Sequence, residues 1–218
     1  MLRILIILFI AFNILVACDS PANDTNGASK PKAQKHLVSD ISMYDNEGNI
    51  RVVIEIPAGS NEKWEVNKKT GIIERDSIDG KPRTIDYLGY PANYGFIPQT
   101  FLPKELGGDG DPLDAIVLGE RKSKGAIVSC QILGVLKLTD RGEMDDKLVL
   151  ADINSHFAEL NSLDELQSKY PGLMMIIQEW FLNYKDPGKL KSRGYAAKGY
   201  GEAIIRKSHS QFVTYNQK

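Results

Sequence analysis

Alternating apolar and polar residues predict that the first part of the chain is built from short strands. Residues 50–56 read IRVVIEI, with apolar side chains at every second position, and this period of two is typical of a strand with one buried face. Residues 63–66 alternate in the same way, which places Lys63 and Glu65 on one face. Turns with Gly and Pro separate these segments, a pattern typical of a sandwich or barrel. Further strands are expected at 71–75, 115–118 and 126–138.

Helical spacing enters only in the last third of the chain. Ser162 and Glu165 have the spacing of a capping box, and Pro171 suits the first turn of a new helix. Apolar residues then recur at helical spacing from Leu173 to Tyr184, and a weaker helix is expected over 201–215. The pattern predicts a mainly β fold with helices (α+β), in which a β-barrel carries helices on its outside.

The N-terminal residues predict a targeting segment. Residues 4–16 are apolar except for Asn13, which is too short a run for a bilayer span but fits the core of a signal peptide. Residues 15–18, LVAC, resemble the lipobox of bacterial lipoproteins, which implies cleavage before Cys18 and its lipidation. An ordinary secretory signal and an uncleaved anchor are the alternatives.

These features divide the chain into three parts. Residues 1–17 are expected to be the signal peptide, and residues 18–40 the lipidated cysteine with a flexible tether, since this stretch has little apolar surface to bury. Residues 41–218 are expected to form the folded domain. The expected location is the cell envelope, periplasm-facing or otherwise extracytoplasmic, with the protein lipid-anchored to a membrane.

Composition excludes some classes of function. The 218 residues are 42% hydrophobic and 25% charged, with a formal net charge of -1, and without a basic run there is no electrostatic basis for nucleic-acid binding. The only cysteines are Cys18 and Cys130, which make no disulfide framework. Cys130 is expected to be a buried core thiol.

Two acidic segments carry the candidate chemistry. Residues 109–114 read DGDPLD and residues 140–146 read DRGEMDD. Carboxylates this close repel one another unless a cation neutralises them, and ligands that are all oxygen favour Mg²⁺, Mn²⁺ or Ca²⁺. A solvated acidic turn is the alternative. An EF-hand calcium loop fits poorly, because Leu113 stands at a ligand position and Asp114 replaces the turn glycine. Together the two segments predict a site for several metal ions.

The first acidic segment resembles the signature of family I soluble inorganic pyrophosphatases, and other segments resemble that family in the same order. These are VVIEIP (52–57), KWE (63–65), YPANYGF (90–96), KLTD (137–140), DDK (145–147) and YK (184–185). The resemblance implies a five-stranded OB-like barrel flanked by two helices. It also implies hydrolysis of pyrophosphate to two phosphates with several Mg²⁺ ions, and a homo-oligomer.

The resemblance assigns roles residue by residue. It implies that Asp111 is the general base toward the attacking water, and that Tyr90 hydrogen-bonds toward that base. The implied metal ligands are Asp109, Asp111, Asp114, Asp140 and Asp145. Glu55 and Glu65 resemble acidic residues that line the site. The implied substrate-binding residues are Lys63, Glu65, Arg83, Tyr94, Lys147, Tyr184 and Lys185.

Two positions depart from the family pattern. Arg141 stands where many relatives have an acid directly after the aspartate, and an insertion-like stretch over 76–83 leaves both Arg75 and Arg83 as phosphate-binding candidates, with Arg83 preferred. A non-catalytic phosphate- or metal-binding lipoprotein on the same fold, and a structural envelope lipoprotein, are the competing interpretations. Retention of Lys63, Asp111 and Asp145 favours the enzyme.

Overall fold

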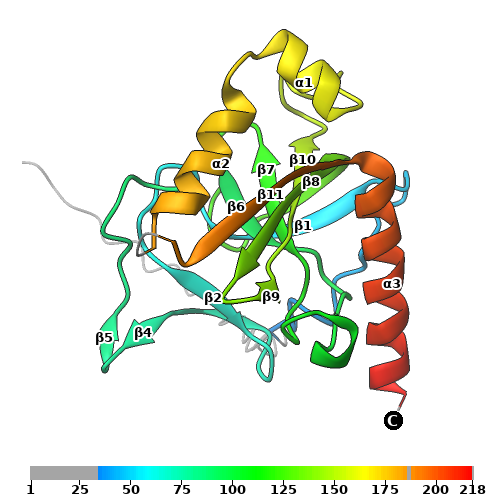
Figure 1. Cartoon of the computed structure of the whole chain (residues 1–218). Coiled ribbons are helices and arrows are strands. Elements are labelled where there is room, and N and C mark those ends of the chain that lie inside the picture. Colours follow the sequence, from blue (N-terminus) through cyan, green and yellow to red (C-terminus); the bar gives the residue numbers. More distant parts are fainter. Residues whose placement is uncertain (1–33, 186–187, 218) are drawn as a thin grey trace, which may run out of the picture. The chain divides into compact units, whose positions relative to one another are not determined.

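The computed structural model describes residues 34–185 and 188–217, which belong to a compact unit that begins at Gln34 (Figure 1). The expected signal peptide and Cys18 lie outside the described residues. Packing starts before residue 41, where the folded domain was expected to begin. The amide of Leu37 donates to the carbonyl of Gly71 at 3.0 Å, and Val38 is buried in a cluster with Val53 and Phe96.

Five strands close into a barrel, as predicted. Their order around it is β1, β6, β7, β10, β8 and back to β1. The parallel pair is β7 with β10, and the other four pairs are antiparallel. If these five strands are counted along the chain, their order around the barrel is thus first, second, third, fifth and fourth. Their bounds are Ile50–Ile56 for β1, Asn93–Phe96 for β6, Asp114–Leu118 for β7, Ile127–Asp140 for β8 and Lys147–Asp152 for β10.

Strand β8 is long because it pairs with other strands beside its barrel partners β1 and β10. Residues 127–130 pair with β1, and residues 134–140 pair with β11 (Leu190–Ala197), while its last residues also pair with β9 (Glu143–Met144). It runs two residues beyond the predicted end at Leu138. Cys130 is fully buried on this strand as a free thiol, as predicted.

Two small hairpins lie outside the barrel sheet. Strand β2 (Trp64–Asn67) pairs with β3 (Ile72–Arg75), and β4 (Ser77–Ile78) pairs with β5 (Lys81–Pro82). The first hairpin agrees with the strands predicted at 63–66 and 71–75. A short 3-10 helix, Lys104–Leu106, precedes the first acidic segment.

Three helices occur in the described part of the chain, in the three regions where the sequence pattern predicts them, whereas the resemblance implied two flanking helices. They are α1 (Leu163–Lys169), α2 (Leu173–Asn183) and α3 (Lys198–Asn216). Ser162 caps α1 by accepting from the amide of Glu165 at 3.1 Å. Helix α1 ends before a turn at Pro171 and Gly172. The buried Trp180 of α2 then packs against the barrel.

Helix α3 begins three residues before the predicted start and packs against β8 (Figure 1). Gly201 makes this close approach feasible, because a Cβ atom there would lie 2.4 Å from Ile132 Cδ1. The N-cap, Ala197, offers no side-chain hydrogen bond, so the sequence carries no capping signal for this start.

Candidate active site

The parallel pair β7 and β10 brings opposite charges together at one end of the barrel. Leu148 lies opposite Ala115 in this pair, so the preceding residues Lys147 and Asp114 begin adjacent strands. The buried Lys147 ammonium contacts the Asp114 carboxylate and lies 2.7 Å from Asp145 Oδ1. Although burial opposes it, the two carboxylates hold the pKa of Lys147 above its usual value.

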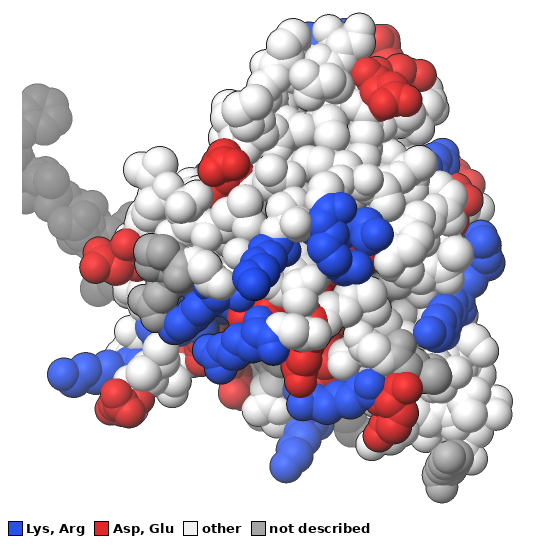
Figure 2. Space-filling view, viewed as in Figure 1, with Lys and Arg blue, Asp and Glu red and all other residues white. Residues whose placement is uncertain are grey.

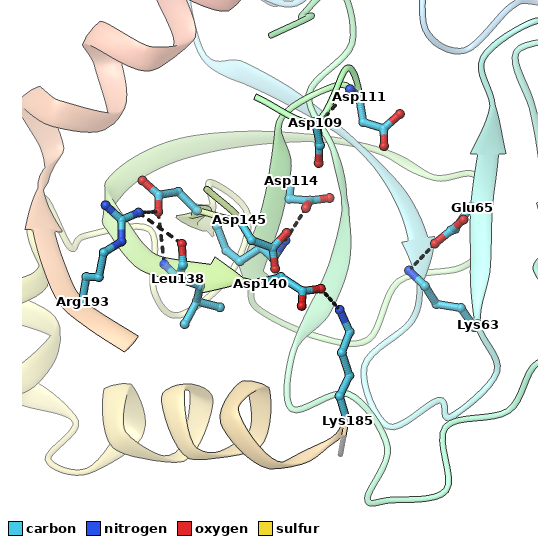
Figure 3. Close-up of polar contacts among 12 residues, drawn as sticks. Lys63, Glu65, Asp109, Asp111, Asp114, Leu138, Asp140, Asp145, Lys185 and Arg193 are labelled. Atoms are coloured by element: carbon cyan, nitrogen blue, oxygen red, sulfur yellow. Dashed lines mark hydrogen bonds and ion pairs between the residues drawn. The ribbon is translucent and has the colours of Figure 1, made fainter. Parts of the chain in front are cut away.

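The first acidic segment stands over this pair (Figure 3). Gly110 has a φ of 85°, a left-handed conformation that glycine adopts without strain, and the turn lets the amide of Asp111 donate to Asp109 Oδ1 at 2.9 Å. Asp109, Asp111, Asp114 and Asp145 line one pocket. Burial, with Asp111 and Asp114 nearby, raises the pKa of Asp109.

Asp140 completes the row of predicted metal ligands, at the end of β8. Its Oδ2 accepts from the Lys185 ammonium at 2.7 Å. Its Oδ1 is buried and has no hydrogen-bond partner among the described residues, and Arg141 Nε lies 3.9 Å away. All five predicted aspartates therefore lie along one side of the site in Figure 3, with Lys63 and Glu65 facing them.

A second pocket shares Asp111 and Asp114 with the first and extends toward β1 and β2. Glu55, Lys63, Glu65 and Tyr94 also line it. Lys63 and Glu65 share a face, as predicted, with an ion pair of 2.9 Å. Glu55 is buried, and desolvation raises its pKa to about 8, although Lys63 and the Val66 amide favour the charged form. On the face in Figure 2, basic side chains surround a central acidic group.

The two candidate arginines have different surroundings. Arg75 pairs with Glu62 at 2.7 Å and lies 5.4 Å from the Trp64 ring. Arg83 pairs with Asp76 at 2.9 Å. Arg83 also interacts electrostatically with Tyr184 and Glu65, two of the predicted substrate-binding residues, and its role as the phosphate-binding arginine stays a prediction.

The predicted tyrosines belong to an aromatic cluster between α2 and the barrel. The ring of Tyr90 lies 5.3 Å from Tyr94 and 4.4 Å from Trp180, and Trp180 stacks on Tyr184 at 4.6 Å. Burial raises the pKa of the Tyr90 and Tyr94 hydroxyls. Among the described residues, no hydrogen bond joins Tyr90 to Asp111, so here Tyr90 contributes packing to the site wall.

The sequence model of the inorganic pyrophosphatase family matches residues 52–213. The chain belongs to this family. Inorganic pyrophosphatase 1 of Caenorhabditis elegans is 33% identical over 198 residues, which are 80% of this chain and 46% of that protein. The chain thus spans about half of that relative's length.

Solved structures agree with the family assignment. An N-terminally truncated vacuolar soluble pyrophosphatase of Trypanosoma cruzi, in complex with PPi, has a TM-score of 0.79 at 25% identity, over 83% of this chain and 79% of that one. The inorganic pyrophosphatase of Helicobacter pylori has a TM-score of 0.66 at 30% identity, over 79% and 98%. The OB-like barrel is therefore the fold that this inorganic pyrophosphatase family shares.

The carboxylates suit the metal ions on which the family depends. Among the described residues, no group of three or more Asp, Glu, His or Cys side chains is arranged to hold a metal ion. The carboxylates lie instead against Lys68, Lys147 and Lys185, because these ammonium groups neutralise their repulsion. Nevertheless the donors are all oxygen, and the buried Asp140 Oδ1 has no hydrogen-bond partner within the described ranges. This donor set fits Mg²⁺.

Sequence reasoning missed Lys68. Its ammonium contacts Asp111 and lies 3.2 Å from the Gly110 carbonyl. Lys68 sits in the turn between β2 and β3, where nothing in the sequence distinguishes it from its neighbour Lys69. No local signal was available, because an odd spacing from Lys63 predicts the opposite face of a strand, and only the turn of the β2 hairpin carries Lys68 to the pocket that Lys63 also lines.

Proposed function

We propose that this protein hydrolyses inorganic pyrophosphate to two phosphates, with several Mg²⁺ ions. One observation carries the proposal: two pockets share Asp111 and Asp114, the first rich in aspartates and the second lined also by Lys63 and Lys68. A site for a highly anionic substrate and its metal ions needs both kinds of group. The PPi complex of the related T. cruzi pyrophosphatase supports the same substrate.

The proposed metal ligands are the five aspartates 109, 111, 114, 140 and 145. Bound Mg²⁺ would offset phosphate charge and lower the pKa of water. Asp111, the most exposed of the four proposed ligands that form ion pairs, at 49% of its side chain, would accept a proton from the attacking water once Lys68 releases it.

The cations would hold the phosphate groups in line for attack. Lys63 faces the row of aspartates and Lys185 lies at its Asp140 end (Figure 3), and Arg83 offers a guanidinium able to bind phosphate through two parallel hydrogen bonds. Tyr184, beside Lys185 at the end of α2, would donate its hydroxyl. Lys147, already paired with Asp114 and Asp145, would keep these carboxylates ionised and in place.

Phosphate release from pyrophosphate, measured with Mg²⁺ and after chelation, tests the proposal. Activity should need Mg²⁺ and return when it is restored. Asp111→Asn should lower turnover by about 10²–10⁴-fold, whereas Asp86→Asn, a change at an exposed aspartate, should not. A folded wild-type protein that releases no phosphate would instead support the non-catalytic binding protein on the same fold.

We also propose that the protein is a lipid-anchored homo-oligomer of the cell envelope. The anchor is supported by the apolar run and lipobox-like residues that end at Cys18, and two or three acyl chains suffice for stable attachment. No helix within residues 34–185 or 188–217 combines the length and apolar character that a bilayer crossing requires.

A further inference from the structure

Asp140 and Asp145, two of the proposed metal ligands, stand at the base of one hairpin. Strand β8 ends at Asp140 and turns into β9 through Arg141 and Gly142, whose φ values are 50° and 94°. Asp140 pairs with Glu143 in this hairpin. The relative position of the two carboxylates therefore depends on how the returning strand is attached to β8.

Leu138 provides that attachment. Its carbonyl accepts from the Asp145 amide at 3.0 Å, and its amide donates to Asp146 Oδ1 at 3.1 Å. Asp145 points into the site while its neighbour Asp146 binds the β8 backbone. Only 8% of the Asp146 side chain is exposed, so this carboxylate needs partners within the protein.

Arg193 supplies the main partner. Its Nη2 contacts Asp146 Oδ1 and also donates to the Leu138 carbonyl at 3.1 Å (Figure 3). The Tyr200 hydroxyl donates to Asp146 Oδ2 at 3.2 Å. Leu138, Asp146, Arg193 and Tyr200 thus form a network, called here the Asp146 network, that joins β8, β11 and α3 behind the metal-binding hairpin.

A bulge aims Arg193 at this network. Strand β11 pairs regularly with β8 up to Ser192 opposite Leu138, and the register then shifts by one residue before Tyr195. Gly194, with a φ of 77°, takes the left-handed position of this bulge, and such bulges redirect side chains. The extra residue lets Arg193 reach across to Leu138 and Asp146.

We propose that Arg193 is a positioning residue that sets the metal affinity of the site, by holding the Asp145–Asp146 segment through the Asp146 network. The inference rests on the proposed function of the aspartates as metal ligands. Arg193 lies behind Asp145, on the side away from Lys63 and Glu65 in Figure 3, so it holds a ligand in place and leaves the substrate to other cations. Its loss should change metal binding far more than turnover at saturating metal.

The test uses the full chain and two readouts. Electron paramagnetic resonance of free Mn²⁺ measures metal binding without substrate, and phosphate release over a range of Mg²⁺ concentrations gives the Mg²⁺ requirement and the turnover at saturation. Arg193→Gln should weaken Mn²⁺ binding and raise the Mg²⁺ requirement by about tenfold, the low end of the effect of outer-shell partners. Turnover at saturating Mg²⁺ should stay within about threefold.

Matched variants separate positioning from general damage. Arg193→Lys keeps the charge, but its ammonium lies one bond nearer the backbone than the Arg193 Nη2 that meets both acceptors, so its metal affinity should fall between those of wild type and Arg193→Gln. Asp146→Asn should resemble Arg193→Gln. Arg206→Gln, at an exposed arginine on α3, is the control and should bind Mn²⁺ like the wild type.

Wild-type Mn²⁺ affinity in folded Arg193→Gln would overturn the proposal, as would loss of turnover with unchanged affinity. If Arg193→Gln fails to fold, Arg193→Lys and Asp146→Asn decide by the same criteria. Failure of the proposed function is distinguishable: the wild type would then release no phosphate, while the Mn²⁺ comparison between variants would still test positioning.

Discussion

Glu55 should make the stability of the protein fall as the pH rises above neutral. Its carboxyl group is 5% exposed, and burial raises its pKa from 4.5 to about 8. Between these values the folded protein holds a proton that the unfolded chain has released. The contribution of protonated Glu55 to the free energy of unfolding is therefore fully present below about pH 4.5 and is lost as the pH rises through 8.

The magnitude follows from the shift. Each pKa unit is equivalent to about 1.4 kcal/mol, so the free energy of unfolding should fall by about 2–3 kcal/mol between pH 6 and 9 and level off near pH 9. Glu55→Gln replaces the neutral carboxyl with a neutral amide of the same size, and it should remove this dependence. The variant should then be more stable than the wild type at pH 9.

Urea unfolding followed by tryptophan fluorescence measures the effect, because Trp180 is buried in the folded protein. Titrations at several pH values, with a chelator present, would give both curves. Glu74→Gln, at an exposed position of β3, is the matched control and should keep the wild-type pH dependence. A wild-type curve that is flat from pH 6 to 9, or a slope that survives in Glu55→Gln, would refute the reasoning.

Three further outcomes are expected. Lys147→Met should lower the free energy of unfolding by about 3 kcal/mol in urea titrations, because it leaves two carboxylates without their buried counter-ion, and adding Asp114→Asn should recover part of the loss. Gly95→Ala should cost about 3 kcal/mol or more in the same assay, because its Cβ would lie 1.9 Å from the Val53 carbonyl oxygen, a backbone atom of β1 that has little room to move. Cys18→Ser should abolish metabolic lipid labelling and leave phosphate release by the domain unchanged; a wild-type protein that is unlabelled and cytosolic would contradict the anchor.

Local pattern located some elements correctly. Strand β1 forms where its period of two predicts a strand, and Ser162 marks the start of α1 through its own cap. The expectation of a single buried face is wrong for β1, since six of its seven residues are buried, Val53 and Glu55 among them. Strand β10 escaped prediction because all six of its residues are buried, so it shows no alternation. Strand β11 escaped because LKSRGYAA has neither period and forms only through its pairing with the second half of β8.

The candidate site shows the same division. Within each acidic segment, and within the Lys63 and Glu65 pair, the residues are close neighbours in the sequence. Turn residues or a spacing of two therefore indicate that they share a face. The contacts of Lys68 with Asp111 and of Arg193 with Asp146 span 43 and 47 residues. Both depend on a turn or a bulge whose direction appears only after the strands have paired, so no local pattern specifies them.

The bulge in β11 also has a consequence for solubility. Strand β11 pairs with β8 alone among the described strands, so its other side presents unpaired backbone groups of the kind that join sheets of different molecules during aggregation. The register shift at Gly194 bends this edge, and the exposed Lys191 places positive charge on the strand. A second molecule approaching edge to edge would meet a distorted ladder and like charge, so the open side of the barrel sheet is protected against intermolecular strand pairing.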